Sequence, residues 1–316
     1  MDVLATKVAR VDELLTTLAV DYSNSALGFA AEKIVPTFMV KKPSGIYFKY
    51  EKGDLRHEDD NRAPGAAAKT TSFGLTQVNY GPLQGHAFKV QVNDELGEQM
   101  GQTLAEKAAT KKTVEKSLIA RERALATTMS DTSIMTSYTT LSGTTQWSDY
   151  ANSTPISDIE TAKTSVLTGA MKPANTLFLS YQAFSVLRNH PELIGRINGL
   201  KEAVSIEQMK AIFGIENIEI MSAQYNTARQ GATDSMAFIW GKHAWVGYVN
   251  PNANEELDSI TFGHTLRVEN ESGPERTRVK KWYDEDEEAT WIRTSSRYEH
   301  KVMAPEAMYF IQNAVA

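Results

Sequence analysis

The chain has 316 residues, of which 41% are hydrophobic, so it is long enough for one large domain or two ordinary ones with a real core. Its formal net charge of -6 argues against tight binding of nucleic acid through phosphates, but it suits a wall that only encloses nucleic acid. The absence of cysteine excludes disulfides and thiolate metal sites, and neither a signal peptide nor an apolar run of about 18 residues is present.

The N-terminal stretch has the pattern of an amphipathic helix. Its apolar residues recur at alternating steps of four and three: Leu4, Val8, Val11, Leu15 and Leu18. Such a helix is too short to be stable alone, so it docks either on its own domain or, as an arm, on a neighbouring subunit. Residues 30–42, around Pro36, predict a short extended entry into the core.

A long hairpin is predicted over residues 44–85. Residues 46–50 are rich in β-formers, residues 70–80 return as a second strand, and the charged stretch 51–69 lies between them. A lone two-stranded ribbon is marginal in water, and this one could reach about 60 Å. Three alternatives are open: the hairpin is a flexible loop, it folds back on its own domain, or it lies on another copy of the chain. Its length and its paired β-character favour the contact with another copy.

Residues 93–129 predict one long helix of roughly 50 Å, a spine for the subunit. Asn93 is a good N-cap, Asp94 and Glu95 suit the first turn, and no proline interrupts the run. A narrow apolar stripe runs along the helix: Leu96, Met100, Leu104, Ala108, Val114, Leu118, Leu125 and Met129.

After this helix, residues 130–154 predict a loop with short strands, and residues 157–251 an α/β lobe. Capping boxes at Ser157–Glu160 and Ser205–Gln208 begin helices that end at Gly169 and Gly214, and a third helix covers 181–188. The predicted strands of the lobe are 176–180, 218–222, 236–240 and 244–249. Strands at 258–269, 275–283, 289–300 and 308–315 are expected to lie with the spine, which makes the lobe an insertion.

Nothing in the sequence predicts a catalytic, cofactor or metal site. The six histidines are not at ligand spacing, and no nucleotide-binding or hydrolase motif occurs. The acidic clusters 58–60 and 284–288 lack the spacing of a calcium loop. An enzyme on the α/β lobe stays as a minor alternative, because acid–base pairs leave no local signature.

The order of these parts resembles the major capsid proteins of tailed bacteriophages, the Hong Kong ninety-seven-type fold. Four short segments add to the resemblance: residues 30–36 (AAEKIVP), 62–65 (RAPG), 187–191 (LRNHP) and 309–313 (YFIQN). The resemblance implies an α+β phage capsid fold. Its expected parts are an N-terminal arm and entry segment (1–43), an extended β-hairpin loop (44–85), a peripheral domain with spine helix and antiparallel sheet (86–156 and 259–316), and an α/β axial domain (157–258).

The resemblance also implies a function. Copies of the chain are expected to assemble, in the bacterial cytoplasm, into hexamers and pentamers of an icosahedral virion capsid that encloses double-stranded DNA without sequence-specific binding. The expected partners are a portal, a possible decoration protein and, because the arm starts at Met1, a separate scaffolding protein. Neither a cofactor nor a membrane is expected. The alternative with the same fold is an encapsulin-type nanocompartment.

Nine residues of the hairpin and spine are the candidates for contacts between subunits. They are Tyr47, Lys49, Lys52, Arg56, Arg62, Lys69, Lys112, Lys116 and Arg121. Some members of the family cross-link subunits through a loop lysine, but no acidic catalyst or acceptor is identified here, so cross-linking is not predicted.

Overall fold

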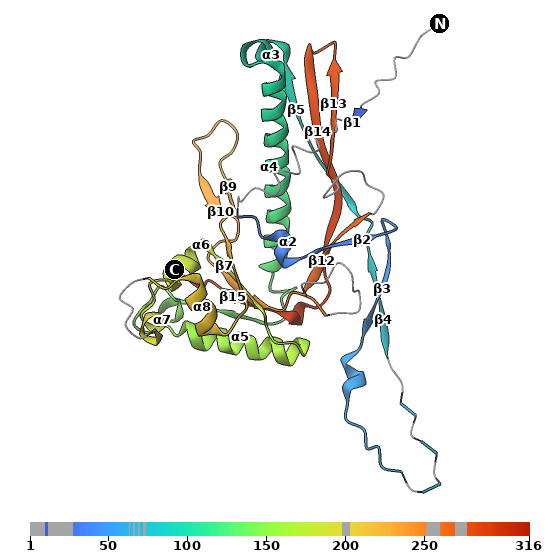
Figure 1. The fold of residues 1–316 in the computed structure, drawn as a ribbon, viewed down its shortest axis with the longest axis vertical. Helices are drawn as coiled ribbons and strands as arrows, with labels where there is room; N and C mark the ends of the chain where they lie inside the picture. Colours follow the sequence, from blue (N-terminus) through green and yellow to red (C-terminus); the bar gives the residue numbers. More distant parts are fainter. Residues whose placement is uncertain are drawn as a thin grey trace.

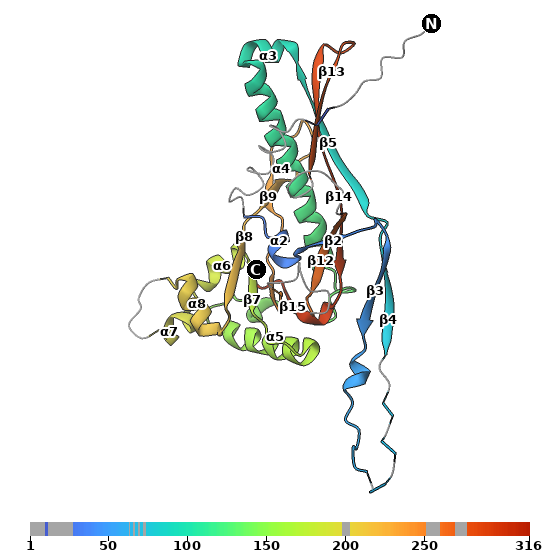
Figure 2. The same ribbon diagram turned by 45° about the vertical axis from the view of Figure 1, so that its right-hand side comes forward.

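The computed structural model describes residues 10–11, 28–62, 64–65, 67–68, 70–71, 74–197, 203–250, 260–268 and 277–316. This part of the chain forms an elongated molecule (Figure 1). A long helix lies beside long strands to form an arm, a lobe packs at the base of the arm, and a hairpin projects in the opposite direction. Figure 2 shows the outer part of the hairpin extending past both the arm and the lobe.

The described helices are α2 (Ala31–Ile34), α3 (Asp94–Met100), α4 (Gln102–Met129), α5 (Pro155–Ala170), α6 (Tyr181–Leu187), α7 (Pro191–Arg196) and α8 (Ile206–Phe213), with short 3-10 turns η1 (Lys52–Leu55), η2 (Gly143–Thr145) and η4 (Pro305–Ala307). The described strands are β1 (Arg10–Val11), β2 (Thr37–Val40), β3 (Gly45–Tyr50), β4 (Leu75–Tyr80), β5 (Gln84–Asn93), β6 (Tyr138–Thr140), β7 (Thr176–Ser180), β8 (Asn217–Met221), β9 (Gln224–Asn226), β10 (Met236–Phe238), β11 (Ala244–Gly247), β12 (Gly263–Val268), β13 (Arg278–Asp284), β14 (Ala289–Val302) and β15 (Met308–Gln312).

The peripheral sheet is organised around the long strand β14. One edge of β14 pairs antiparallel with β5, from Ala289 opposite Asn93 to Tyr298 opposite Gln84. The other edge pairs first with β13 and then with β12, which in turn pairs in parallel with β2. The short β1 pairs with β13. The prediction of long antiparallel strands beside the spine is confirmed for β12, β13 and β14.

The predicted single spine helix is wrong at one point, because it is broken into α3 and α4 at Gly101. Gly101 has φ +83° and ψ 122°, whereas an α-helix requires negative φ at every residue. Glycine reaches this conformation without the steric cost of a Cβ atom, so the chain turns there and α3 lies across the end of α4 (Figure 1). The 28 residues of α4 then run about 42 Å along the sheet. Asn93 is the N-cap residue, but its side chain makes no capping hydrogen bond.

Small and polar side chains carry the contact between α4 and the peripheral sheet. Ala105, Ala109 and Thr113 recur every four residues on the buried side of α4, and Thr113 Oγ1 lies 2.8 Å from Thr294 Oγ1 on β14. Small residues let the helix lie close to the strands. The predicted stripe is therefore right at Val114, Leu125 and Met129, which are buried, and wrong at Leu96, Leu104 and Ala108, which are exposed.

The lobe sheet has the order β6-β15-β11-β7-β8, and both of its faces are covered. Leu177 and Leu179 of β7 face a core shared with α5 to α8, while Phe178 faces a second core shared with α2 and the end of α4. Trp245 on β11 stacks on Phe310 at 5.3 Å, and its indole N–H donates to the Met129 carbonyl of the spine at 3.1 Å. The lobe and the spine therefore share one packed junction.

Strand β15 belongs to this lobe sheet, between β6 and β11. The expectation that every closing strand lies with the spine is therefore wrong for β15. The physical reason is that Met308 to Ile311 are buried on both faces, which suits a central strand and not a half-exposed one.

The N-terminal expectations need two corrections. Arg10 and Val11 form a strand, not part of a helix, and the rest of the predicted helix over 4–18 lies outside the described residues. The entry segment 30–42 is not extended throughout, because α2 forms a helical turn before β2 begins at Thr37.

The helix signals of the lobe predict one helix start correctly and one incorrectly. Ser205 and Gln208 form the predicted capping box of α8, and Gly214 ends that helix at φ +60°. By contrast α5 begins at Pro155 with Thr154 as its N-cap, three residues before the predicted N-cap Ser157, so the Ser157–Glu160 box is wrong. Proline at the first helical position has the right φ and lacks the N–H that such a position leaves unpaired. The predicted helix over 181–188 and the strands at 176–180, 218–222, 236–240 and 244–249 are confirmed to within a few residues.

Candidate assembly surfaces

Strands β3 and β4 form a two-stranded ribbon that joins neither of the larger sheets. Because alternate residues of a strand point to opposite faces, the ribbon has two different sides. On one side Ile46, Phe48 and Leu75 are 53%, 58% and 42% exposed. On the other side Tyr47 and Lys49 are half-buried. One apolar face of the ribbon is thus left open by the described parts of its own chain.

The base of the ribbon is fastened to the lobe through Glu306 on η4. Lys52 Nζ lies 3.0 Å from the Glu306 carboxylate and also donates to the Gly169 carbonyl at the end of α5. Lys49 Nζ lies 3.7 Å from the same carboxylate and donates to the Met303 carbonyl at 3.3 Å. Burial raises the pKa of Glu306, but a backbone N–H and the two ammonium groups outweigh it and hold this pKa below its ordinary value. These two lysines, predicted to contact a neighbour, thus contact their own chain.

The other hairpin candidates lie along the ribbon and its tip. Tyr47 is half-buried near the body, where burial, and then the Glu299 carboxylate, raise the pKa of its phenol. Arg56 and Arg62 are exposed beyond η1. Lys69 lies outside the described residues.

The three spine candidates do not share one surface. Lys112 and Lys116 are exposed on α4. Arg121 is only 5% exposed, and its guanidinium forms an ion pair with Glu32 at 3.0 Å. Arg121 therefore lies inside the subunit. No local pattern indicates this burial, because an arginine on a long charged helix is ordinarily solvated.

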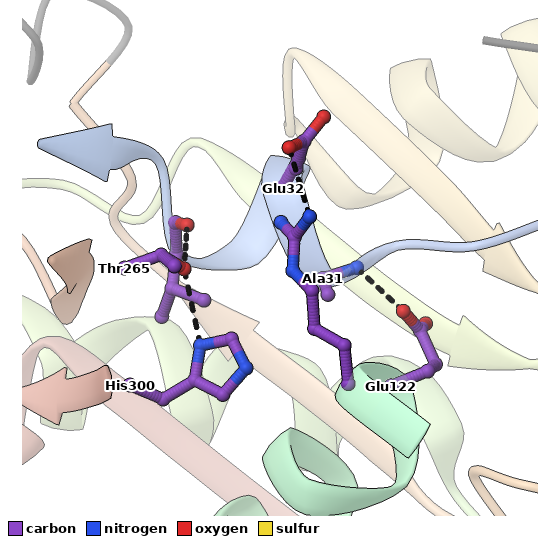
Figure 3. A network of polar contacts seen from close by, with 7 residues as sticks. Ala31, Glu32, Glu122, Thr265 and His300 are labelled. Atoms are coloured by element: carbon purple, nitrogen blue, oxygen red, sulfur yellow. Dashed lines mark hydrogen bonds and ion pairs between the residues drawn. The ribbon is translucent and has the colours of Figure 1, made fainter. Parts of the chain in front are cut away.

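Glu122, next to it, is a buried residue that the sequence pattern does not single out. Its carboxylate accepts the backbone N–H groups of Ala30 at 2.7 Å and Ala31 at 3.0 Å, which are the free donors at the start of α2, as Figure 3 shows for Ala31. It also accepts the Trp240 indole N–H at 2.7 Å. Burial raises the pKa of Glu122, and these hydrogen bonds oppose that rise. One carboxylate thus joins the entry segment, the spine and the lobe.

His300 on β14 lies beside the same junction (Figure 3). Its Nδ1 is 3.0 Å from Thr265 Oγ1, which donates its own proton to the Val35 carbonyl at 3.0 Å, so Nδ1 carries the imidazole hydrogen. Burial, and then the positive charges of Arg121 and Arg267, lower the pKa of His300 to about 3. The ring is therefore neutral at physiological pH.

Among the described residues, no three or more His, Asp or Glu side chains gather so that they could hold a metal ion. Of the described helices, none is both long and apolar enough to cross a membrane. What the arrangement does offer is an open apolar ribbon held at a fixed base and, extending in the opposite direction, a long spine helix with one exposed side.

Comparison with known proteins decides what kind of molecule carries these surfaces. No protein-family model matches the sequence. The major capsid protein of Burkholderia phage BcepMu is 26% identical over 315 residues, covering 96% of this chain and 97% of the relative. The crystal structure of a phage-related protein from Bordetella bronchiseptica RB50 superposes with a TM-score of 0.75 at 25% identity, covering 97% of this chain and 98% of that one.

The chain is similar over nearly its whole length to phage major capsid proteins, and this similarity supports a phage head shell protein. Its fold is also found in the capsid of the myovirus phage XM1, at a TM-score of 0.52 and 10% identity over 98% of this chain. The expected α+β phage capsid fold is thereby confirmed. For a phage shell protein, the projecting ribbon and the exposed spine are the surfaces to consider for assembly, and the nanocompartment alternative is not favoured.

Proposed function

We propose that copies of this chain form the hexamers and pentamers of an icosahedral phage head that encloses double-stranded DNA. The observation that carries this proposal is the open face of the ribbon, where Ile46, Phe48 and Leu75 remain exposed in the single subunit. Burying one such side chain fully stabilises a contact by about 1.5–3 kcal/mol. A neighbouring copy can supply that burial at every contact in a shell.

The fastened base supports a ribbon that projects and does not fold back. Lys49 and Lys52 hold β3 and η1 to Glu306, so the residues beyond them start in a defined direction. A two-stranded ribbon is marginal in water on its own, and a partner surface removes that weakness. We therefore retain the hairpin as a contact between subunits, with its two base lysines reassigned to the subunit's own lobe.

The spine of the next copy is the partner surface that fits the ribbon. Leu96 and Leu104 are 42% and 57% exposed on α3 and α4, and Lys112 and Lys116 are exposed further along α4. An apolar ribbon hooked over these residues makes a head-to-tail contact, and such contacts close into rings when the rotation between copies allows it. Hexamers and pentamers are two such closures.

The remaining roles in the proposal follow from charge and from the kind of relatives. A net charge of -6 favours a wall that encloses DNA without binding its sequence. We propose that the protein is not an enzyme, assembles in the bacterial cytoplasm, and works with a separate scaffolding protein, a portal and a possible decoration protein. Nuclease-resistant DNA inside purified particles distinguishes a phage head from a nanocompartment filled with protein.

Deletion of residues 51–69 tests the hooking contact. The shortened chain is expected to fold, because the described residues between 51 and 69 are exposed, but to form few particles. Circular dichroism and thermal unfolding check the fold, and sedimentation measures the particles. If the shortened chain assembles as efficiently as the full chain, the ribbon does not hold the shell together.

A further inference from the structure

The peripheral sheet has a second face, which no described helix covers. Thr290 and Thr294 of β14 point to α4, so Trp291 and Arg293, at the alternating positions of the strand, point away from it. The residues on this open face form neighbouring rows across three strands. One row is Trp282, Trp291 and Gln91; the next is Lys280, Arg293 and Lys89; and Arg278 begins the third.

Four cations of this open face form no ion pair within the described part of the chain. Lys89, Arg278, Lys280 and Arg293 form no ion pair there, whereas Lys281 on the other face pairs with Glu106 at 2.7 Å. Lys89 Nζ lies over the Trp291 ring at 4.0 Å, and the Arg293 guanidinium lies 5.9 Å from the Trp282 ring.

Arg293 also keeps a buried Nε without a hydrogen-bond partner among the described residues. The rings of Trp282 and Trp291 stack with their centroids 6.4 Å apart, so the basic face also contains a packed aromatic pair.

The end of the same arm carries the opposite charge. The β13–β14 turn and the adjoining α3 hold seven carboxylates, the acidic tip: Asp94, Glu95, Glu98, Glu285, Asp286, Glu287 and Glu288. Hydrogen bonding from its hydroxyl to Asp94, with burial and the nearby carboxylates adding to it, raises the pKa of Tyr283 at this tip. The arm thus has a negatively charged tip and, along one face of its sheet, a positively charged surface that contains two tryptophans.

We propose that the acidic tip of one copy docks on the open face of a second copy. This contact rests on the proposed function, since it needs copies that assemble, but it involves the arm and not the ribbon. Opposite potentials across an interface steer the encounter and fix its register. Tip and face belong to the same arm, so two arms that lie antiparallel make the contact twice, and arms around a three-fold axis make it three times.

A second copy fits this face better than nucleic acid does. The carboxylates of the tip border the face, and Glu287 reaches onto it by accepting the Trp291 indole N–H at 2.6 Å. A phosphate backbone laid along the arm meets this negative end and is repelled there. A second acidic tip needs only the basic part of the face, whose Lys89, Arg278, Lys280 and Arg293 form no ion pair with the described residues of their own chain.

Paired cysteines test the contact directly, because the natural chain contains no cysteine. Chains carrying Asp286→Cys are mixed with chains carrying Lys280→Cys, assembled, and oxidised. A disulfide needs Cα atoms within about 7 Å, whereas the strand from Lys280 to Asp284 alone spans about 13 Å, so a bond between these positions joins two copies.

We expect disulfide dimers in the mixture and not in either variant alone. Asp286→Cys mixed with Lys112→Cys is the matched control, because Lys112 is an exposed residue of α4 and does not belong to the open face of the sheet. No dimer in the first mixture, or equal dimer in the control mixture, overturns the proposal.

Charge exchange gives a second, independent test. Reversing the face (Arg278→Glu with Lys280→Glu) or the tip (Glu285→Lys with Asp286→Lys) is expected to lower the fraction of chain in particles by about tenfold. Combining both reversals restores it, which a folding defect does not do. Unchanged yield in either single reversal, or no recovery in the combination, contradicts the docking.

Two further results separate the alternatives. If reversing the face leaves particle yield unchanged but removes nuclease-protected DNA, the face binds DNA and the docking proposal is wrong. If the natural chain forms no particles under any assembly condition, the proposed function fails. If it forms particles while the cysteine mixture gives no dimer, only the tip-to-face contact fails.

Discussion

The Glu122 carboxylate accepts the indole N–H of Trp240 at 2.7 Å, in the interior of the subunit. Glu122 lies on α4 and Trp240 belongs to the lobe, so this hydrogen bond joins the two largest parts of the molecule. The same carboxylate caps the start of α2 through Ala30 and Ala31. A subunit whose arm and ribbon are proposed to contact other copies needs such a junction, because it holds the entry segment, the spine and the lobe in one arrangement.

Removing Glu122 should therefore destabilise the whole subunit. Glu122→Ala leaves three buried N–H donors without an acceptor, and we expect a loss of at least about 3 kcal/mol in the free energy of unfolding. Glu122→Gln keeps one acceptor oxygen and should cost roughly 1–3 kcal/mol. Chemical denaturation measures both, with Glu207→Ala, at an exposed ion pair, as a control that changes little. A Glu122→Ala chain as stable as the natural one would show that the junction is held elsewhere.

His300 should make the subunit sensitive to acid. Its folded pKa of about 3 lies below the ordinary value of 6.5, so the unfolded chain binds a proton more readily over that interval. Stability that is present above pH 6.5 is therefore lost as the pH falls toward 3. His300→Asn keeps a donor for Thr265 and removes this titration, so its unfolding free energy should fall less steeply with acid. His190, His243 and His264 have lowered pKa values too, so part of the slope remains. Equal slopes for both chains would contradict the assignment.

The break in the spine gives a matched pair of glycine substitutions. Gly101 and Gly195 both have open space where the Cβ atom of an alanine would lie, but only Gly101 has a positive φ. Gly101→Ala should therefore cost on the order of 1–3 kcal/mol through backbone strain. Gly195→Ala, inside α7, should be neutral or slightly stabilising. Thermal unfolding of both chains decides, and equal effects would mean that the break at Gly101 is not required by the fold.

The ribbon face should matter for assembly and not for the subunit. Ile46→Ser with Phe48→Ser removes apolar surface that is already exposed, so the unfolding free energy of the subunit should change by less than about 0.5 kcal/mol. The concentration needed for assembly should rise more than tenfold, because each contact loses a burial of about 1.5–3 kcal/mol. Leu167→Ser, at a side chain that is 51% exposed on α5, is the control. Light scattering against concentration measures the difference, and an unchanged threshold would exclude this face from the contact.

Local signals in the sequence are enough to predict most elements. Ser205 with Gln208, the buried run at β7 and the β-formers of β3 each act over a few residues, and each predicts its element correctly. The order of the parts then points to the capsid fold, which the comparisons confirm.

The errors arise where distant segments decide the outcome. A glycine within a run of helix-forming residues lowers the expected stability of the helix only slightly, so the sequence does not predict a break at Gly101. The break becomes evident only in the folded arm, where Gly101 has a positive φ. Leu104 has the helical spacing of a core residue, but close packing on β14 selects Ala105 and Ala109 instead. Glu122 and Arg121 look like any charged pair on a helix, because their partners come from residues far away in the chain. The assignment of β15 to the wrong sheet has the same cause.

The most direct test of the central claim is electron microscopy of the purified full-length chain under conditions that promote assembly, in parallel with the chain lacking residues 51–69. We predict closed particles with icosahedral symmetry, built of hexamers and pentamers, for the full chain, and folded but dispersed subunits for the shortened one. A full chain that stays monomeric at every concentration, or a shortened chain that forms the same particles, would contradict it.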